Sequence, residues 1–360
     1  MTGPTPVIVF AEVRSFYAAA ERARDPGLRD RPIIVGGDPR KRGQVQSASP
    51  DALAAGVRPG MSMLEALDCC PRARAVRTDM PFYREVSGQL RVCLGSEVEA
   101  LEPMGLDAAF LAPALGSEAA RAPEAFAVRL QERVLSELGV PLVVGVAAVK
   151  FLARIAAAEA GESAVCRVLS GEEASFLNPL PVGRLPGVGP KTVARLEQLG
   201  AHKVGDLLRV GRARLEAELG NHGLRILEFA RGEDASSVRR ARHPRSLSRE
   251  LTFDEPQLDV GVLWDRLQWL AKGLEAALRR EGLAARRVAL KLRYADLEQT
   301  TRSHTLRQPV STAADIYAAT QRLLDRTHAG SRAVRLLGVT LAGLASPQPA
   351  ERQLELFSEP

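Results

Sequence analysis

Residues 9–21 read Val9-Phe10-Ala11-Glu12-Val13-Arg14-Ser15-Phe16-Tyr17-Ala18-Ala19-Ala20-Glu21. The apolar run that starts at residue 7 is typical of a buried strand, and an alanine-rich helical pattern follows it. A second segment, Gly105-Leu106-Asp107-Ala108-Ala109-Phe110-Leu111, again sets one carboxylate beside an apolar run. The sequence therefore offers two candidate functional carboxylates, Glu12 and Asp107, each next to a predicted strand.

Composition limits the class of protein. The chain has 360 residues, a mass of 38.8 kDa and 46% hydrophobic residues, so we expect two to four domains with apolar cores. Its four cysteines fit neither a zinc site nor a disulfide framework, which favours reduced thiols in a cytosol. Without a signal-peptide pattern or an apolar run of about 18 residues, we expect a soluble cytoplasmic protein with no membrane partner.

The charge balance favours a polyanionic partner. The formal net charge is +6 and the isoelectric point is about 9.4. Arginine greatly outnumbers lysine, which suits bidentate contact with phosphates, although codon bias explains the same excess equally well.

The hydrophobic pattern changes along the chain. Strand and helix patterns alternate up to about residue 171, with a helical insert over residues 47–70, and they indicate an α/β layer architecture. Helical patterns dominate residues 172–232. Residues 239–249 hold five arginines and no acid and are expected to be a linker. Residues 250–345 return to strand and helix patterns, and the remaining residues have a composition typical of disorder.

Residues 185–196 contain a glycine turn between two predicted helices, with Gly187, Gly189 and Lys191 at its centre. Backbone N–H groups of such a turn can approach a phosphate at the start of the second helix, and the lysine adds positive charge. This reading predicts binding to a nucleic-acid backbone without sequence specificity. The alternative is an ordinary turn between two helices.

These segments together resemble the Y-family, or lesion-bypass, DNA polymerases. The resemblance spans residues 7–345 and rests on six motifs in the family's order: Ser15-Phe16-Tyr17-Ala18, the Asp107 strand, residues 144–156, Leu185-Pro186-Gly187-Val188-Gly189, Ser248-Arg249-Glu250 and Leu336-Leu337-Gly338-Val339. It implies a multidomain α/β fold shaped as a right hand. The implied domains are a palm (1–13 and 72–171), fingers (14–71), a helix-hairpin-helix thumb (172–238), a basic linker (239–249), an α+β little finger (250–345) and a tail (346–360).

The family's catalytic positions are only partly acidic in this chain. The resemblance assigns Glu12 and Asp107 to metal binding and catalysis, whereas Ala108 stands where the family has a glutamate and Arg14 replaces a less stringent acid. Two-metal phosphoryl transfer needs several acidic oxygens to hold its ions about 3.5–4 Å apart. The resemblance therefore predicts Mg²⁺ as cofactor if the protein is catalytic, and none otherwise.

The nucleotide-contacting positions show similar losses. Phe16 and Tyr17 are retained, and Tyr17 stands where the family excludes ribonucleotides, although aromatic packing explains both residues equally well. Pro50 and Leu53 occupy the positions of a tyrosine and an arginine that contact the triphosphate. Residues 161–164 replace a segment that normally supplies a phosphate-binding lysine.

The resemblance also assigns residues to macromolecular contacts. The expected DNA-binding residues are Gly187, Gly189, Lys191, Arg249, Arg286, Arg287, Lys291, Arg293 and Arg302, for which a solvated charged face is the plainer interpretation of any single member. The tail resembles the peptide with which bacterial polymerases bind the sliding clamp, through Gln353, Leu354, Leu356 and Phe357.

Three functions follow as hypotheses. The first is a non-catalytic paralogue similar to ImuB-type proteins, a bacterial cytoplasmic and nucleoid-associated adaptor that links DNA and the clamp to an error-prone C-family polymerase in DNA repair and SOS mutagenesis. The second is an active translesion DNA polymerase that uses Glu12 and Asp107. The third is a clamp-binding competitor that limits the access of other polymerases.

Overall fold

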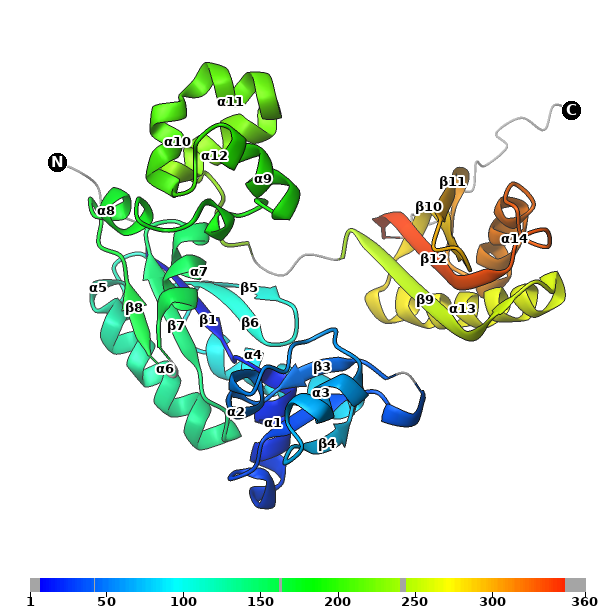
Figure 1. The fold of residues 1–360 in the computed structure, drawn as a ribbon, viewed down its shortest axis with the longest axis horizontal. Coiled ribbons are helices and arrows are strands. Elements are labelled where there is room, and N and C mark those ends of the chain that lie inside the picture. Colours follow the sequence, from blue (N-terminus) through cyan, green and yellow to red (C-terminus); the bar gives the residue numbers. More distant parts are fainter. Residues whose placement is uncertain (1–6, 42, 162–163, 240–243, 347–360) are drawn as a thin grey trace, which may run out of the picture. The chain divides into compact units, whose positions relative to one another are not determined.

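The computed structural model describes residues 7–41, 43–161, 164–239 and 244–346. The chain divides into two compact units, Met1–Ala241 and Arg242–Pro360 (Figure 1). Each unit has its own sheets and its own hydrophobic core. In the described residues no helix is both long and apolar enough to cross a membrane.

A five-stranded sheet with strand order β5-β6-β1-β7-β8 forms the centre of the first unit. Its strands are β1 (Ile8–Glu12), β5 (Ala100–Met104), β6 (Ala108–Ala112), β7 (Val143–Ala147) and β8 (Val165–Arg167). Successive side chains of β1 point to opposite faces. Ile8 and Phe10 join the core on the side of α7 (Lys150–Glu159), whereas Val9 and Ala11 join the core that includes α4 (Met80–Gly95) and α6 (Pro123–Leu138). Helices thus cover both faces of this sheet, as the α/β expectation requires.

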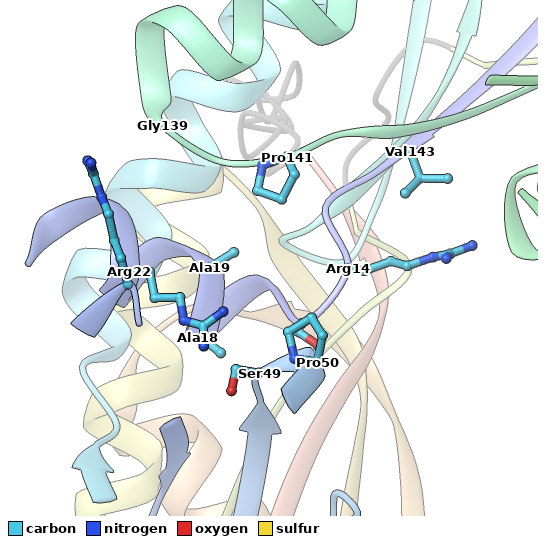
Figure 2. A pocket seen from close by; sticks show the side chains of 11 residues that line it. Arg14, Ala18, Ala19, Arg22, Ser49, Pro50, Gly139, Pro141 and Val143 are labelled. Atoms are coloured by element: carbon cyan, nitrogen blue, oxygen red, sulfur yellow. The ribbon is translucent and has the colours of Figure 1, made fainter. Parts of the chain in front are cut away.

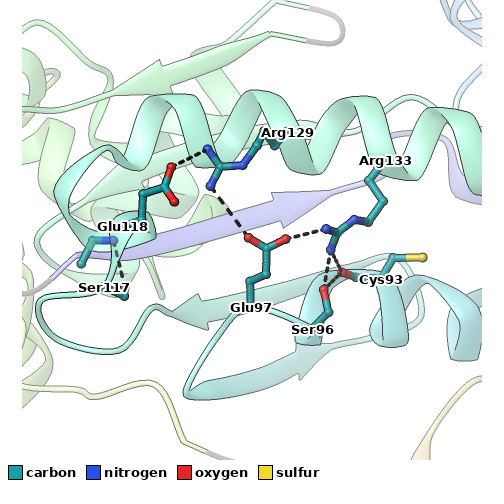
Figure 3. A network of polar contacts seen from close by, with 8 residues as sticks. Cys93, Ser96, Glu97, Ser117, Glu118, Arg129 and Arg133 are labelled. Carbon is teal, nitrogen blue, oxygen red and sulfur yellow. Dashed lines mark hydrogen bonds and ion pairs between the residues drawn. The ribbon is translucent and has the colours of Figure 1, made fainter.

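The outer side of this helical layer carries a network of ion pairs (Figure 3). Glu97, just after α4, pairs with Arg129 and Arg133 of α6, and Arg129 also reaches Glu118 in α5 (Glu118–Arg121). These side chains are 32–83% exposed, so each pair adds little free energy, and their joint effect is to fix the end of α4 against α6.

A smaller sheet, β3-β2-β4, follows the first helix α1 (Phe16–Arg24). It consists of β2 (Ile33–Gly36), β3 (Val45–Ala48) and β4 (Arg74–Arg77), and its core includes residues of α2 (Pro50–Ala54) and α3 (Met63–Cys69). β4 pairs parallel to β2. The boundary between fingers and palm was expected after residue 71. β4 lies beyond that boundary but is hydrogen-bonded to β2, so the expected boundary cuts this sheet.

The thumb segment is helical, as expected. It contains α8 (Glu173–Leu177), α9 (Pro190–Gln198), α10 (Val204–Val210), α11 (Arg212–Leu219) and α12 (Asn221–Ala230). Leu177, Leu196 and Ile226 belong to the same core as Phe10 and Phe151 of the palm. The thumb therefore shares its core with the α7 face of the central sheet.

The second unit is an antiparallel sheet with order β11-β10-β12-β9, covered on one face by two helices. Its elements are β9 (Ser246–Gln257), α13 (Val260–Glu281), β10 (Ala284–Tyr294), β11 (Gln299–Val310), α14 (Ala313–Leu324) and β12 (Val334–Ala345). β9 begins at Ser246, inside the expected linker. Ser248 and Arg249 pair with β12, so the arginine-rich composition of residues 239–249 hid the start of an edge strand.

Gly145 of β7 allows the close approach of α7 to the sheet. A Cβ atom at this position would lie 2.0 Å from the carbonyl oxygen of Ala153 and 2.4 Å from the amide nitrogen of Ala157. Both are backbone atoms and cannot turn away, so the helix would have to move off the sheet. Gly88, in the exposed face of α4, has no atom within 4 Å of such a Cβ.

We predict that Gly145→Ala destabilises the first unit by about 3 kcal/mol or more through overpacking. Gly88→Ala should instead stabilise it by about 0.5–1 kcal/mol, because alanine costs less backbone entropy in a helix. Urea unfolding followed by far-ultraviolet circular dichroism measures both changes. The only two tryptophans, Trp264 and Trp269, lie on α13, so their fluorescence reports the second unit as a control. An unchanged circular-dichroism transition in Gly145→Ala would contradict the close packing of α7.

Candidate active site and DNA-binding surfaces

Glu12 and Asp107 meet at one edge of the central sheet. Glu12 is the last residue of β1 and pairs with Ala108, the first residue of β6. One residue further, the amide of Val13 donates a 2.9 Å hydrogen bond to the carbonyl oxygen of Asp107. The antiparallel register thus brings together two carboxylates that are 95 positions apart in the sequence, and both are half-buried.

The electrostatics of this pair disfavour double ionisation. Burial raises the pKa of Glu12 above its ordinary value, and the charge of Asp107 raises it further. Burial likewise raises the pKa of Asp107. Arg154 on the exposed side of α7 lowers both pKa values, and Arg14 lowers that of Glu12. Arg154 lies within the motif of residues 144–156, but the sequence analysis gave it no role at this site.

The residues at this edge do not fit a two-metal centre. The position beside Asp107 carries only the methyl group of Ala108, which is 8% exposed. In the part of the chain that the structure describes, no group of three or more histidine, cysteine or acidic side chains could hold a metal ion. Two carboxylates within electrostatic reach of two arginines supply too few acidic oxygens for two divalent ions.

Arg14 turns away from the carboxylates. Its Nη2 donates hydrogen bonds of 2.6, 3.1 and 2.9 Å to the carbonyl oxygens of Ala157, Ala158 and Ala160 at the end of α7. The last carbonyls of a helix lack intrahelical partners and carry partial negative charge, so a guanidinium stabilises them. Arg14 thus caps the C-terminal end of α7. Figure 2 shows its side chain pointing away from Pro50, with which it lines a cavity at the turn between β1 and α1.

A cavity of about 480 Å³ lies beside Asp107, between the palm edge and the small sheet. Its lining residues are Ser15, Phe16, Tyr17, Gln46, Ser47, Ala48, Leu53, Pro59, Gly105, Leu106 and Asp107. Asp107 is the only charged residue among them. Leu53, which the sequence analysis predicted to stand at a phosphate-contacting position, contributes an apolar side chain to this lining.

Tyr17 lines this cavity and is fixed from behind by Tyr83 of α4. The two rings stack with centroids 4.3 Å apart and an angle of 12° between their planes. The Tyr83 hydroxyl donates a 2.8 Å hydrogen bond to Glu21, which is 2% exposed and also pairs with Arg24. Phe16 is 5% exposed and belongs to the core, so packing accounts for most of its surface. The sequence analysis did not predict a role for Tyr83. The available hint was its partner Glu21, an acid that directly follows three alanines.

The glycine turn of the thumb has the expected backbone form. Gly187 has φ of 78°, a left-handed conformation, and Gly189 caps α9 with extended backbone. Lys191 in the first turn of α9 is exposed. A Cβ at Gly187 would lie 3.1 Å from Cε1 of His222 in α12, so the similar glycine turn at Gly220 lies next to it.

The basic residues of the second unit lie on different faces of its sheet. Val288, Leu290 and Leu292 are buried under the helices, so the alternate positions of β10 form the open face. That face carries Arg287, Lys291 and Arg293, with Arg286 exposed beside the β-bulge. Opposite them stand Thr305, Thr301 and Gln299 of β11. Lys291 pairs with Glu250 at 2.9 Å.

Two predicted DNA-binding residues belong to the opposite, helix-covered face. Arg302 pairs across the sheet with buried Leu290, and its Nε donates a 3.1 Å hydrogen bond to the carbonyl oxygen of Arg326, just after α14. The guanidinium of Arg249 packs over Gly273 of α13 and occupies the space that a Cβ atom at position 273 would take. The resemblance assigned both residues to DNA binding without specifying a face of the sheet, and strand register decides which face a side chain takes. The clamp-binding residues predicted in the tail, Gln353, Leu354, Leu356 and Phe357, lie outside the described residues.

Comparison with known proteins now identifies the family. The impB/mucB/samB family profile matches residues 12–158, its C-terminal domain profile matches residues 244–356, and a profile described as the thumb domain of DNA polymerase iota matches residues 183–234. The chain belongs to this family, which is the Y family of DNA polymerases.

Individual relatives cover nearly the whole chain. DNA polymerase IV of Halorhodospira halophila is 39% identical over 98% of both chains, and DNA polymerase IV of Methanoculleus marisnigri is 36% identical over 99% of both. Among solved structures, a Dbh–Dpo4 chimera of Y-family DNA polymerase superimposes with a TM-score of 0.85 at 23% identity, covering 94% of this chain and 99% of the chimera. DinB from Sulfolobus solfataricus gives a TM-score of 0.67, covering 95% of this chain and all of that one. The right-hand fold with thumb and little finger is thereby confirmed.

The raised pKa values predict a pH-dependent effect on stability. An ionised carboxylate whose pKa is raised in the folded state costs stability above that pKa, and the cost disappears as the pH falls through it. We therefore expect Glu12→Gln and Asp107→Asn to raise the melting temperature at neutral pH, by roughly 2–4 °C for each kcal/mol relieved. The gain should shrink as the pH falls from neutral through the raised pKa values of the two carboxyl groups, where they take up protons in the folded protein.

Differential scanning calorimetry across this pH range, with and without Mg²⁺, measures the effect. The matched control is Asp296→Asn in the second unit, whose pKa is lowered by a hydrogen bond from Arg332, so this substitution should lower stability at neutral pH. Stabilisation of the unchanged protein by Mg²⁺, absent in both carboxylate variants, would show that the pair still holds an ion.

Proposed function

We propose that this protein grips DNA with the Y-family frame and acts as an adaptor in translesion synthesis, without nucleotidyl transfer of its own. The observation that carries the proposal is the carboxylate pair Glu12 and Asp107, which lacks a third acidic ligand and lies within electrostatic reach of Arg14 and Arg154. Such a pair offers two carboxylates where two-metal phosphoryl transfer needs several acidic oxygens.

The nucleotide-binding groups support the same proposal. Leu53, which lines the cavity beside Asp107, stands where the resemblance places an arginine. Pro50 stands where it places a tyrosine, and Ala108 where it places a glutamate. Loss of one electrostatic donor at a reacting centre typically costs about 2.7–4 kcal/mol. Several such losses together reduce the rate by many orders of magnitude, even where their effects are not additive.

An active translesion polymerase is the second candidate. Glu12 and Asp107 meet at one edge of the sheet, beside a cavity that Tyr17 also lines, and this arrangement favours an active enzyme. Relatives that match nearly the full length of this chain and carry the name DNA polymerase IV favour it as well. The extra methylene of Glu12 shifts its carboxylate by about one bond length relative to aspartate. A displacement of about 1 Å at a reacting group can cost about 100-fold in rate.

Primer extension distinguishes the two candidates. We expect no template-dependent nucleotide addition on undamaged or abasic templates with Mg²⁺ or Mn²⁺, with or without clamp, and the same result for the Glu12→Ala/Asp107→Ala double variant. Duplex binding, measured beside it, should be retained by both proteins. Extension by the unchanged protein that disappears in the double variant would establish a polymerase and reject the adaptor.

DNA binding is proposed to use the thumb turn and the open face of the second unit's sheet. Arg287 and Arg293 project from that face without an acidic partner among the described residues, whereas Lys291 is paired with Glu250. Each phosphate contact contributes about 0.9 to the slope of log affinity against log salt.

We predict that Arg287→Ala and Arg293→Ala each weaken duplex binding similarly for all sequences and reduce the salt slope by about one. Arg302→Ala is the matched control, because it removes the same charge from the helix-covered face and should leave the slope unchanged. Fluorescence anisotropy over a salt series gives the slopes. An equal loss of slope in Arg302→Ala would mean that net charge, and not this face, determines binding.

The partners in this proposal are the sliding clamp, through Gln353–Phe357, and an error-prone C-family polymerase. The clamp contact rests on the tail motif in the sequence. The polymerase partner follows from the proposed lack of catalysis, because an adaptor needs an enzyme to extend the primer.

A further inference from the structure

Residues 233–239 follow α12 and form a strap without regular secondary structure, which belongs to the first unit. The thumb end of the strap is fixed by Asp234, whose side chain is 4% exposed. This carboxylate pairs with Arg225 of α12 at 3.0 Å and accepts hydrogen bonds from the amide and the hydroxyl group of Ser236 at 3.0 and 2.7 Å. The strap therefore begins as a fixed continuation of the thumb.

The other end of the strap is held by Glu102, in the middle of the palm edge strand β5. The backbone amide of Arg239 donates a 2.8 Å hydrogen bond to Oε2 of Glu102. Glu102 stands opposite Phe110 in the register of β5 and β6, so its side chain lies on the α7 side of the sheet. Val238 packs against the core on that same side. One apolar contact and one hydrogen bond to a carboxylate thus hold the end of the strap on the palm.

Lys150, the first residue of α7, fixes the orientation of the Glu102 carboxylate. Its Nζ lies 2.8 Å from each carboxylate oxygen and 4.8 Å from the centroid of the Phe110 ring. The side chain of Lys150 is 13% exposed and that of Glu102 is 27% exposed, so salt screens this pair less than it screens the surface pairs of the palm. Glu102 therefore presents Oε2 to the strap in one defined position.

The contact at Arg239 determines how much free chain precedes the second unit. The sheet of that unit begins at Ser246, so about six residues, 240–245, follow the contact. If the contact were lost, the fixed part of the strap would end at Ser236, and about nine residues would precede the sheet. An extended chain spans about 3.3–3.6 Å per residue, so the longest possible span would grow from about 20 Å to about 30 Å.

We propose that Glu102 anchors the strap to the palm and thereby limits the reach of the second unit. Release of the anchor lengthens the tether by half, which lowers the effective concentration of one unit near the other about twofold. Where both units bind one duplex, a consequence that rests on the proposed function, the anchor favours their simultaneous binding. The anchor itself consists of contacts within the first unit, and it stands whether or not the protein binds DNA or extends a primer.

Hydrogen–deuterium exchange of the DNA-free full-length protein, followed by mass spectrometry of overlapping peptides, tests the anchor. We expect the Arg239 amide to exchange about tenfold faster in Glu102→Gln, the change expected for loss of one charge-assisted hydrogen bond. Val238→Ser loosens the strap without changing the palm and should accelerate the same amide. The Ser236 amide, which is held by Asp234, should exchange at an unchanged rate in both variants.

Small-angle X-ray scattering of the same proteins measures the reach. The maximum dimension should rise by about 10 Å in Glu102→Gln and in Val238→Ser. Glu124→Gln is the matched control, because it removes the same charge from the same unit, where the partner is Arg167 of β8 rather than Lys150. Unchanged exchange at Arg239 in Glu102→Gln, or equal acceleration in Glu124→Gln, would overturn the anchor. Faster exchange in both strap variants with unchanged scattering would show that the contact does not limit the reach, and would overturn the proposal as well.

Discussion

The antiparallel pairing of β1 with β6 and β7 is the constraint on which the rest of the first unit depends. It sets Glu12 opposite Ala108 and brings Asp107 within one residue of the same edge. It also gives β1 two buried faces, so that alternate side chains join two different cores. One of those cores continues into the thumb and the other includes α1, α4 and α6.

The sequence predicted the frame well because the frame rests on local patterns. The apolar run of β1, the strand after Asp107 and the glycine turn at Gly187 each carry their own signal, and the structure has all three. The errors arose where pairing between distant segments decides the outcome. β4 joined the small sheet through β2, and Ser246–Arg249 became an edge strand although their composition was typical of a linker. The DNA-binding assignment of Arg249 and Arg302 named no face of the sheet, because only register separates the two faces.

The candidate site was predicted in part for the same reason. Glu12, Asp107 and Tyr17 belong to recognisable motifs, and the structure brings all three to one place. Tyr83, Arg84 and Arg154 act on those residues from helices, and the sequence analysis assigned none of the three to the site. Tyr83 stacks on Tyr17, Arg84 lowers the pKa of Tyr17, and Arg154 lowers the pKa of both carboxylates. A sequence pattern indicates which groups are present, whereas their charge environment depends on what the fold packs beside them.

Arg14 couples the turn after β1 to the far end of α7. Its three hydrogen bonds cover the carbonyl oxygens of Ala157, Ala158 and Ala160. A side chain without donors at this position would leave those carbonyls without the guanidinium that stabilises the negative end of the helix. The turn that follows Glu12 and the end of α7 are therefore joined mechanically by this side chain, so that a shift of the helix would move the edge of the sheet that carries the carboxylates.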